Sequence, residues 1–236
     1  MRAAILEVRA RVIATPRQSP PPKETPRHGR TREIDVTVDK ADITGLVLCG
    51  GRGSRMGGVD KGLQMHGGQP LALHALRRLA PQVSSVMVSA NRNLDRYSDF
   101  GAPVWPDDWP GHPGPLAGWL AGLSRCNTQW MLAVPCDSPA FPLDLGARLS
   151  AAVHAAQADI AMAATAPHGV LQPQPAFCLL RATLQASLRA SLGAGRRQAS
   201  QWAAQHHMVQ VVFDDEAAFF NANTQAELRQ LQPTQT

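Results

Sequence analysis

Glycines and basic side chains gather in one short stretch, residues 50–61, whose types and spacing suit the binding of phosphate. It contains five glycines, two arginines and Lys61. Glycine lets backbone N–H groups approach a ligand with no Cβ in the way, and successive N–H groups in a turn form a concavity that favours anions. The basic side chains add charge to such a site. The stretch therefore predicts a loop that wraps a phosphorylated ligand.

This loop does not match the two commonest phosphate-binding patterns. Lys61 is followed by Gly62 and not by Ser or Thr, which argues against a Walker-type loop. The Gly51-x-Gly53 pair lacks the third glycine of a dinucleotide fingerprint, and no helical pattern begins until about Pro70. On its glycines alone the stretch is equally compatible with a simple turn.

Alternating strand and helix patterns must position this loop. Strands are predicted at residues 43–48, 83–90, 103–105, 129–135, 159–164, 174–180 and 208–213. Helices are predicted at residues 70–79, 94–98, 116–124, 143–156, 182–192, 196–205 and 227–231, the last capped by Thr224. Such alternation implies right-handed crossovers, an α/β class and a mostly parallel sheet.

Two acidic residues also follow predicted strands. In an open α/β sheet, ligands bind outside the carboxyl ends of the strands, where the sequence places the glycine loop, Asp107 and Asp137. Magnesium takes one or two carboxylates together with phosphates and waters, and Asp137 is the best candidate for it. From the residues alone, a strand-end turn or a helix cap before Pro139 explains Asp137 better than a metal site does, and the start of a turn explains Asp107.

As a whole, residues 48–63 resemble the signature of the molybdenum cofactor guanylyltransferase family, L-A-G-G-x-x-x-R-M-G-G-x-D-K-G-L. The match is complete except at Cys49, where the family usually has Ala. This resemblance covers about residues 43 to 231 and implies a three-layer Rossmann-like nucleotidyltransferase fold. Asp137 lies in a run that matches the family's P-C-D-x-P motif, and residues 221–224 match its N-x-N-T motif.

The resemblance also implies roles for individual residues. Nucleotide binding falls to Leu48, Cys49, Gly50, Gly51, Lys61, Ser89, Asp107, Gly114 and Asp137. Lys61, Arg55 and Asp137 are implied as catalytic, Asp137 as the ligand of Mg²⁺, and Asn221 and Asn223 as acceptor-binding. One departure is Ser89, because the family often has Asn there in an N-A-N-R run. Serine can still donate and accept a hydrogen bond.

The implied reaction is transfer of GMP from Mg-GTP to molybdenum-loaded molybdopterin, with release of pyrophosphate. Molybdoenzymes and their assembly factors are further candidate partners. The alternatives are a cytidylyltransferase or sugar-nucleotidyltransferase of the same fold, and a non-catalytic nucleotide-binding scaffold in molybdoenzyme assembly. The Gly50-Gly51 pair favours guanine, since the cytidylyl relatives have L-A-A-G. Retention of Lys61, Arg55 and Asp137 together argues against the scaffold.

Bulk properties agree with a single enzyme domain. The chain has 236 residues, 44% hydrophobic and 17% charged, with a net charge of +5. Residues 1–42 are rich in Pro and Arg, and we expect them to form a disordered extension before a domain at residues 43–236. They carry much of the excess charge, so nucleic-acid binding is not expected. Four scattered cysteines and the lack of a long apolar run predict a cytoplasmic, membrane-free protein, expected to be monomeric.

Overall fold

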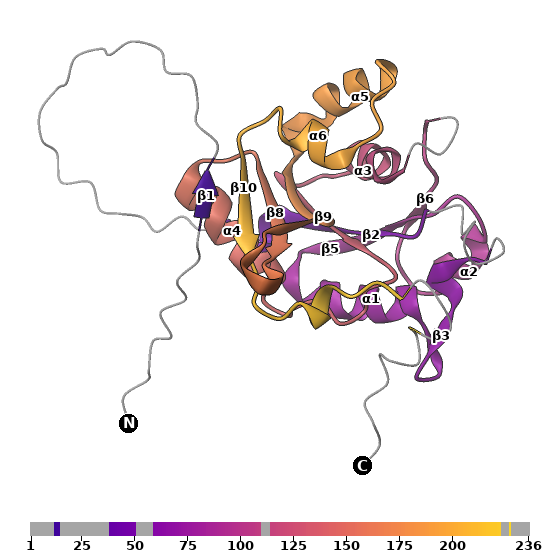
Figure 1. The fold of residues 1–236 in the computed structure, drawn as a ribbon. Helices are drawn as coiled ribbons and strands as arrows, with labels where there is room; N and C mark the ends of the chain where they lie inside the picture. The colour runs from indigo at the N-terminus through magenta and orange to yellow at the C-terminus, as the bar shows by residue number, and fades with distance from the viewer. Residues whose placement is uncertain (1–11, 15–37, 51–58, 110–113, 223–226, 228–236) are drawn as a thin grey trace, which may run out of the picture.

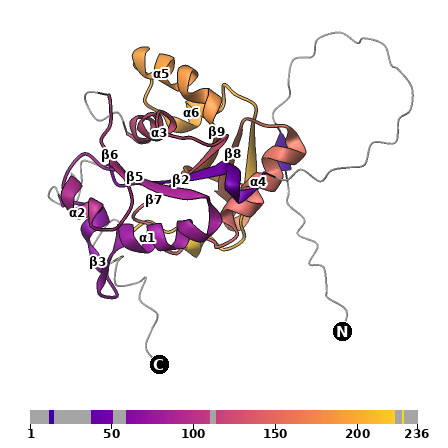
Figure 2. The same cartoon turned by 180° about the vertical axis from the view of Figure 1, so that it is seen from behind.

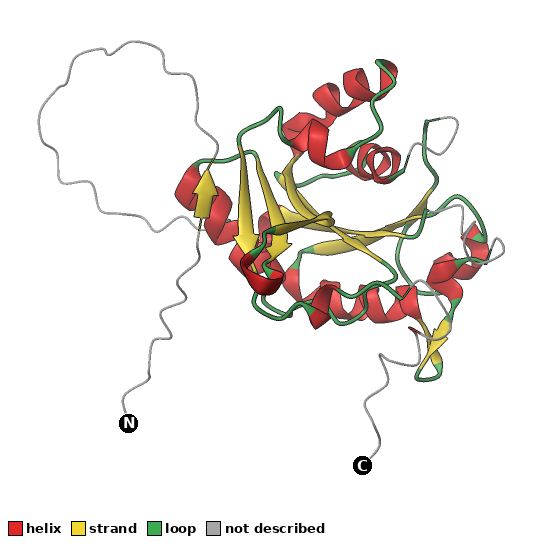
Figure 3. Cartoon of the chain, viewed as in Figure 1, coloured by secondary structure: helices red, strands yellow, loops and turns green. Residues whose placement is uncertain are grey.

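An eight-stranded sheet forms the middle layer of the molecule, with helices on both faces (Figures 1 and 3). The structure is a computed structural model, and it describes residues 12–14, 38–50, 59–109, 114–222 and 227. The strand order is β1-β10-β8-β9-β7-β2-β5-β6. These strands are β1 (Val12–Ala14), β2 (Ile43–Leu48), β5 (Ser85–Ser89), β6 (Val104–Trp105), β7 (Trp130–Pro135), β8 (Ile160–Thr165), β9 (Gln172–Arg181) and β10 (Met208–Val212).

The strands that carry the predicted site run in one direction. β7, β2, β5 and β6 are neighbours and pair in parallel, as do β8 and β10. β9 lies between β7 and β8 and is antiparallel to both. Only residues 166–171 join β8 to β9, and they include one turn of 3₁₀ helix. A connection this short cannot cross over to a parallel position, so the two strands form a hairpin. The predicted α/β class and mostly parallel sheet are confirmed.

Two groups of helices cover the two faces of the sheet, as the front and back views agree (Figures 1 and 2). One face packs against α1 (Leu71–Leu79) and α4 (Leu145–Ala156), and the other against α3 (Pro115–Leu123), α5 (Gln185–Gly193) and α6 (Ala199–Ala203). The short helix α2 (Leu94–Ser98) lies near the edge strand β6.

The central strands are buried on both faces, which explains their apolar sequences. In β2, Val47 faces the α1 side of the core, whereas Leu46 faces the α3 side. All six residues of β7 are buried. Because successive side chains of a strand point to opposite faces, a strand covered on both faces reads as a continuous apolar run. This pattern made β2 and β7 predictable.

Several elements differ from the sequence prediction. A small hairpin of β3 (Met65–His66) and β4 (Gln69–Pro70) precedes α1, and it was not predicted. The predicted helix at 196–205 is shorter, since α6 spans only Ala199–Ala203. The predicted closing helix at 227–231 and its cap Thr224 lie outside the described residues, except for Glu227.

The predicted disordered extension at residues 1–42 also stays a prediction, because most of it lies outside the described residues. Two parts of it are described. Val12–Ala14 pairs with the edge of the sheet along β10. Val38 packs against the core, and Lys40–Asp42 forms a 3₁₀ turn that leads directly into β2. Contacts with the domain therefore extend at least a few residues before Ile43.

In the part of the chain that the structure describes, no helix is long and apolar enough to cross a bilayer.

Candidate functional site

The carboxyl ends of four neighbouring strands place the predicted site residues along one edge of the sheet. Gly50 follows β2, Asn91 follows β5, Asp107 follows β6 and Asp137 follows β7. Since these strands are parallel, their ends lie side by side. At a strand spacing of about 4.8 Å, the span from β7 to β6 is roughly 14 Å. This edge is long enough for an extended nucleoside triphosphate.

At the β7 end of this edge, near the middle of the whole sheet, Lys61 forms an ion pair with Asp137, here called the central pair. The distance from Lys61 Nζ to Asp137 Oδ2 is 3.0 Å, and their side chains are 28% and 15% exposed. Lys61 comes from the 3₁₀ turn Lys61–Leu63, and Asp137 follows the buried strand β7. Two residues 76 positions apart in sequence thus meet beside the start of the glycine loop.

The turn that carries Lys61 is fixed by its neighbours on α2. Asp60 accepts hydrogen bonds from the hydroxyl of Tyr97 and from the amide of Asn93, the latter at 2.9 Å. Burial raises the pKa of Tyr97, so the phenol stays protonated and donates to Asp60. A Cβ on Gly62 would lie 2.4 Å from the Tyr97 hydroxyl oxygen, so this turn can approach α2 only with glycine there.

The segment near the C-terminus reaches the same place. Ala222 N–H donates to the carbonyl oxygen of Asp137 at 2.8 Å, and Ser138, which is fully buried, donates from its hydroxyl to the side-chain oxygen of Asn221. The predicted acceptor-binding residue Asn221 therefore lies beside the central pair. Its predicted companion, Asn223, is outside the described residues.

Two cysteines line the floor between β2 and β7. Cys49 and Cys136 are buried free thiols that follow paired strands. A side-chain hydrogen bond with Cys49, together with burial, raises the pKa of Cys136, so this thiol stays protonated. Cys49 N–H donates to the carbonyl of Ser89 at 2.8 Å. Both residues extend the sheet by one position and serve as packing beneath the site.

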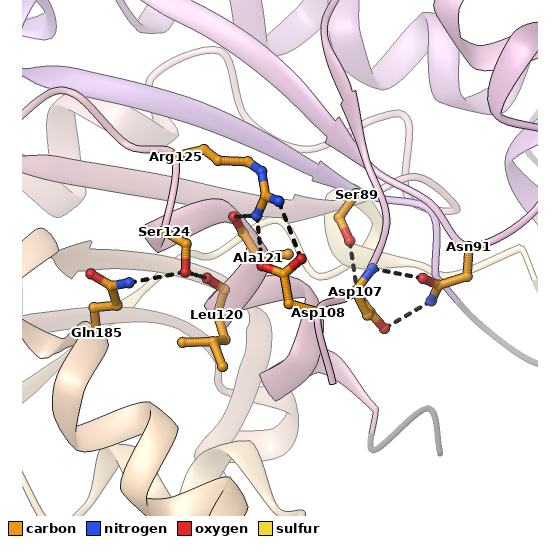
Figure 4. Close-up of polar contacts among 9 residues, drawn as sticks. All are labelled: Ser89, Asn91, Asp107, Asp108, Leu120, Ala121, Ser124, Arg125 and Gln185. Atoms are coloured by element: carbon orange, nitrogen blue, oxygen red, sulfur yellow. Dashed lines mark hydrogen bonds and ion pairs between the residues drawn. The ribbon is translucent and has the colours of Figure 1, made fainter. Parts of the chain in front are cut away.

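At the other end of the edge, Asp107 is held by Ser89 and Asn91, and we call these three residues the edge network (Figure 4). Ser89 Oγ donates to Asp107 Oδ1 at 3.3 Å, and Asn91 Nδ2 donates to Oδ2 at 2.8 Å. In return, Asn91 Oδ1 accepts from the backbone N–H of Asp107 at 2.8 Å. The carboxylate of Asp107 therefore receives one side-chain donor on each oxygen.

Ser89 lies beneath α3. It is only 1% exposed, and a Cβ on Gly118 of α3 would lie 3.1 Å from Ser89 Oγ and 2.7 Å from Leu48 Cδ2. Glycine at 118 thus lets α3 pack directly on the ends of β2 and β5. Gly114, another predicted site residue, precedes α3 with a φ of 81°, a backbone conformation that favours glycine.

The loop that bears Asp107 is tied to the end of α3 by Asp108 (Figure 4). Arg125 makes two hydrogen bonds to the Asp108 carboxylate, at 2.8 and 3.1 Å, and its guanidinium carbon lies 4.6 Å from the centre of the Trp105 ring. The hydrogen bond from Arg125 holds the pKa of Asp108 below its ordinary value. This planar, two-pronged contact suits arginine and not lysine.

The structure thus unites some predicted residues and leaves others undescribed. It joins Lys61 with Asp137 and Ser89 with Asp107, and it places Leu48, Cys49 and Gly50 at the end of β2. Gly51 and Arg55 lie outside the described residues. In the described part of the chain, no three His, Cys, Asp or Glu side chains gather as a metal cage.

Sequence reasoning missed the residues that support the site: Asp60, Asn91, Asn93, Tyr97, Asp108, Arg125 and Ser138. Two signals could have found some of them. Tyr97 is the only tyrosine of the chain, and Asn91 stands two residues past a strand end, in the same run as Ser89. The partners of both come from distant segments, which the sequence does not reveal.

Known proteins resemble this chain over most of its length. A family model described as "MobA-like NTP transferase domain" matches residues 45–211. A molybdenum cofactor guanylyltransferase from Bordetella petrii is 58% identical over 194 residues, which cover 82% of this chain and 99% of that protein. One from Acidovorax ebreus is 55% identical over 206 residues, covering 83% and 97%.

Solved structures share the fold. Molybdopterin-guanine dinucleotide biosynthesis protein A from Archaeoglobus fulgidus superposes with a TM-score of 0.66 at 21% identity, covering 79% of this chain and 95% of that one. A 4-diphosphocytidyl-2C-methyl-D-erythritol synthase from Anaerococcus prevotii gives 0.65 at 12% identity, covering 81% and 96%. The family match spans most of the sheet, and the two relatives are more than half identical over nearly their whole length. The chain belongs to the molybdenum cofactor guanylyltransferases of the MobA-like NTP transferase family.

Proposed function

We propose that the protein transfers GMP from Mg-GTP to the terminal phosphate of molybdenum-loaded molybdopterin and releases pyrophosphate. The observation that carries this proposal is the central pair. A lysine and an aspartate meet beside the first glycine of the loop, in a chain whose relatives at 55–58% identity are named molybdenum cofactor guanylyltransferases. Cation and carboxylate together suit a triphosphate and its metal ion.

The residues fit a magnesium ion whose coordination is completed by the phosphates of the substrate. The Asp137 side chain is mostly buried at the end of β7 but still reaches solvent, and Lys61 donates a hydrogen bond to its Oδ2. Magnesium usually binds through one or two carboxylates plus phosphates and waters, so a single aspartate is sufficient. Asp137 would hold the ion, which would neutralise charge on the triphosphate.

The other residues of the site would position the reactants. An oxygen of the acceptor phosphate attacks the α-phosphorus of GTP, the bond from that phosphorus to the bridging oxygen breaks, and pyrophosphate leaves. The acceptor is already ionised at neutral pH, so no general base is needed. Lys61 would stabilise the negative charge that develops at the α-phosphorus, and Arg55 would neutralise the pyrophosphate.

The two ends of the site would then hold different parts of the substrates. Backbone amides at Gly50 and Gly51 would bind the triphosphate, while Asp107, supported by Ser89, would bind the nucleoside at the end of β6. Gly114 would bring the N-terminus of α3 over the nucleotide. Asn221 and Asn223 would face the acceptor, since Asn221 is hydrogen-bonded to Ser138, the residue after Asp137. The expected monomeric state and cytoplasmic location belong to the same proposal.

A direct assay tests the proposal. The protein is incubated with magnesium, molybdenum-loaded molybdopterin and each labelled nucleoside triphosphate in turn, and the products are identified. We expect pyrophosphate and the guanine dinucleotide from GTP, with discrimination against CTP of up to about 10⁴-fold. Comparable turnover of CTP would assign the cytidylyl branch. Binding of GTP without any pyrophosphate would favour the scaffold.

A further inference from the structure

Asn91 links two parts of the site that come from different strands. It stands at the end of β5, the strand between β2 and β6. On one side its amide exchanges two hydrogen bonds with Asp107, both at 2.8 Å (Figure 4). On the other side it lies against Gly50, because a Cβ placed on that glycine would be 3.3 Å from Asn91 Nδ2.

The pair of hydrogen bonds fixes the whole of Asp107 and not only its side chain. Asn91 Oδ1 accepts from the Asp107 backbone N–H, so the main chain is held, and Nδ2 donates to Oδ2, so the carboxylate cannot rotate freely. β6 has only two residues and lies at the edge of the sheet, with Trp105 36% exposed. A strand this short supplies little backbone pairing, so side chains must set the position of Asp107.

The chemistry of this contact requires an amide. Only the amide of Asn or Gln carries a donor nitrogen and a separate acceptor oxygen on the same terminal carbon, so that it can donate to the carboxylate and accept from the backbone N–H of one residue. Aspartate at 91 would still accept from the backbone N–H, but it would bring a second carboxylate against Asp107. Glutamine would be one methylene too long for the space beside Gly50.

We infer that Asn91 is a positioning residue, which holds the Asp107 carboxylate in register with the start of the glycine loop and so sets the nucleoside end of the site. This inference rests on the proposed function, because Asp107 binds a nucleotide only in that proposal. Asn91 acts through Asp107 and is not itself required to contact the ligand.

The test measures GTP affinity by titration calorimetry with magnesium present, and no acceptor is needed. Asn91→Asp has nearly the size of the native side chain and keeps the acceptor for the Asp107 N–H. It loses the donor to a carboxylate, so we expect GTP binding to weaken by about tenfold to a hundredfold. Asn91→Ala should weaken it to a similar degree.

A double-mutant cycle separates positioning from general structural damage. If Asn91 acts through Asp107, then adding Asn91→Ala to Asp107→Ala should change the GTP affinity by less than about twofold beyond the single Asp107→Ala variant. A loss that persists in full without Asp107 would overturn the inference. Unchanged affinity in the Asn91 variants would overturn it as well.

Gln82 provides a matched control, because it uses the same chemistry at the opposite end of β5. Its amide donates to the carbonyl of Arg78 and accepts from the N–H of Gly146 at 2.9 Å. Gln82→Ala should lower the melting temperature and leave GTP affinity unchanged; an equal loss of affinity would show that any broken amide contact has this effect and would overturn the inference. A wild-type protein that fails to bind GTP would overturn the proposed function, and the inference with it. A wild-type protein that binds GTP with the same affinity as the Asn91 variants would overturn the inference alone.

Discussion

The central pair and the edge network each place an aspartate at the end of a parallel strand, but the structure supports the two in different ways. Asp137 follows a six-residue strand that is buried throughout, and its side chain pairs with Lys61, a charged residue from a distant turn. Asp107 follows a two-residue edge strand, and it is held by neutral donors on both oxygens.

This difference reflects what each strand can supply. β7 pairs with a neighbour on either side, so the backbone at Asp137 is already fixed and the side chain can carry function. β6 pairs on one side only within the described residues. Side-chain contacts replace the missing backbone pairing there, from Asn91 within the edge network and from Arg125 next to it. The position of Asp107 therefore depends on side chains from outside its own strand.

The largest effect is expected at the central pair. Lys61→Ala and Asp137→Asn should each reduce GMP transfer by on the order of 10²-fold or more, as for loss of one preorganised electrostatic group. Excess magnesium should recover part of the activity of Asp137→Asn and none of that of Lys61→Ala. Steady-state kinetics across a magnesium series measure both effects.

Both variants should remain folded, because the central pair is partly exposed at the end of the sheet. Wild-type rates in both would show that the catalytic roles are assigned wrongly. Equal recovery of the two variants by magnesium would contradict the different roles given to Lys61 and Asp137.

A smaller effect on stability is expected where α3 covers the edge network. Gly118→Ala introduces a Cβ 2.7 Å from Leu48 Cδ2 and 3.1 Å from Ser89 Oγ. Overpacking costs about 1–3 kcal/mol, against roughly 1 kcal/mol gained in helix propensity. We expect a net loss of up to about 2 kcal/mol in chemical denaturation.

Gly193 of α5 is the matched control for this substitution. Its added Cβ would meet only Trp109, at an ordinary contact distance of 3.8 Å. Gly193→Ala should therefore leave stability equal or slightly higher. If Gly118→Ala is no less stable than Gly193→Ala, then α3 is not packed as tightly on β2 and β5 as the structure places it.

The ion pair beside the edge network should contribute less still. Arg125→Ala should lower stability at pH 7 by about 1 kcal/mol or less, since the pair with Asp108 is partly exposed. The folded pKa of Asp108 is depressed, so its contribution is present above the unfolded pKa of about 3.9 and is lost as the pH falls through the lower folded value.

Urea denaturation at pH 7 and at steps toward pH 3 checks this expectation. The gap in stability between wild type and Arg125→Ala should shrink below about pH 4. A gap that grows on acidification would mean that the Asp108 carboxylate is not stabilised by Arg125. Arg125→Lys keeps the charge but loses the two-pronged contact and the Trp105 stacking. Its stability should lie between those of wild type and Arg125→Ala.

The smallest effect is expected at the N-terminus. Deleting residues 1–37 removes the short pairing of β1 with β10 and should leave the activity unchanged and the melting temperature nearly so. Deleting residues 1–42 also removes Val38 and the turn before β2, and should lower the melting temperature further. Calorimetry on both truncations compares them, and a large loss from the shorter deletion would show that the extension is part of the fold.

The same contrast explains how much the sequence could predict. Buried strands such as β2 and β7 can be recognised as apolar runs, and two separate motifs of contiguous residues point to Lys61 and Asp137. The hairpin β3–β4 has two residues in each strand, too few for a period to show. The antiparallel direction of β9 follows from the short connection before it, and the residue types within the strand do not indicate that direction.

The hydrogen bonds that hold the site residues in place were the hardest feature to predict from the sequence. Tyr97 meets Asp60 across 37 positions, and Ser138 meets Asn221 across 83. Each is an ordinary polar residue whose role exists only when the fold brings the two segments together. Ser89 illustrates the limit, because its type predicts a hydrogen bond, whereas its burial under Gly118 could be learned only from the packing of α3.

In the proposed function, Asp137 acts on the metal and the triphosphate, whereas Asp107 acts on the nucleoside. GTP affinity measured without and with saturating magnesium, for wild type, Asp137→Asn and Asp107→Asn, tests it most directly. We expect magnesium to tighten GTP binding in wild type and in Asp107→Asn but not in Asp137→Asn. Asp107→Asn should bind GTP more weakly than wild type under both conditions. The same magnesium dependence in all three proteins would contradict it.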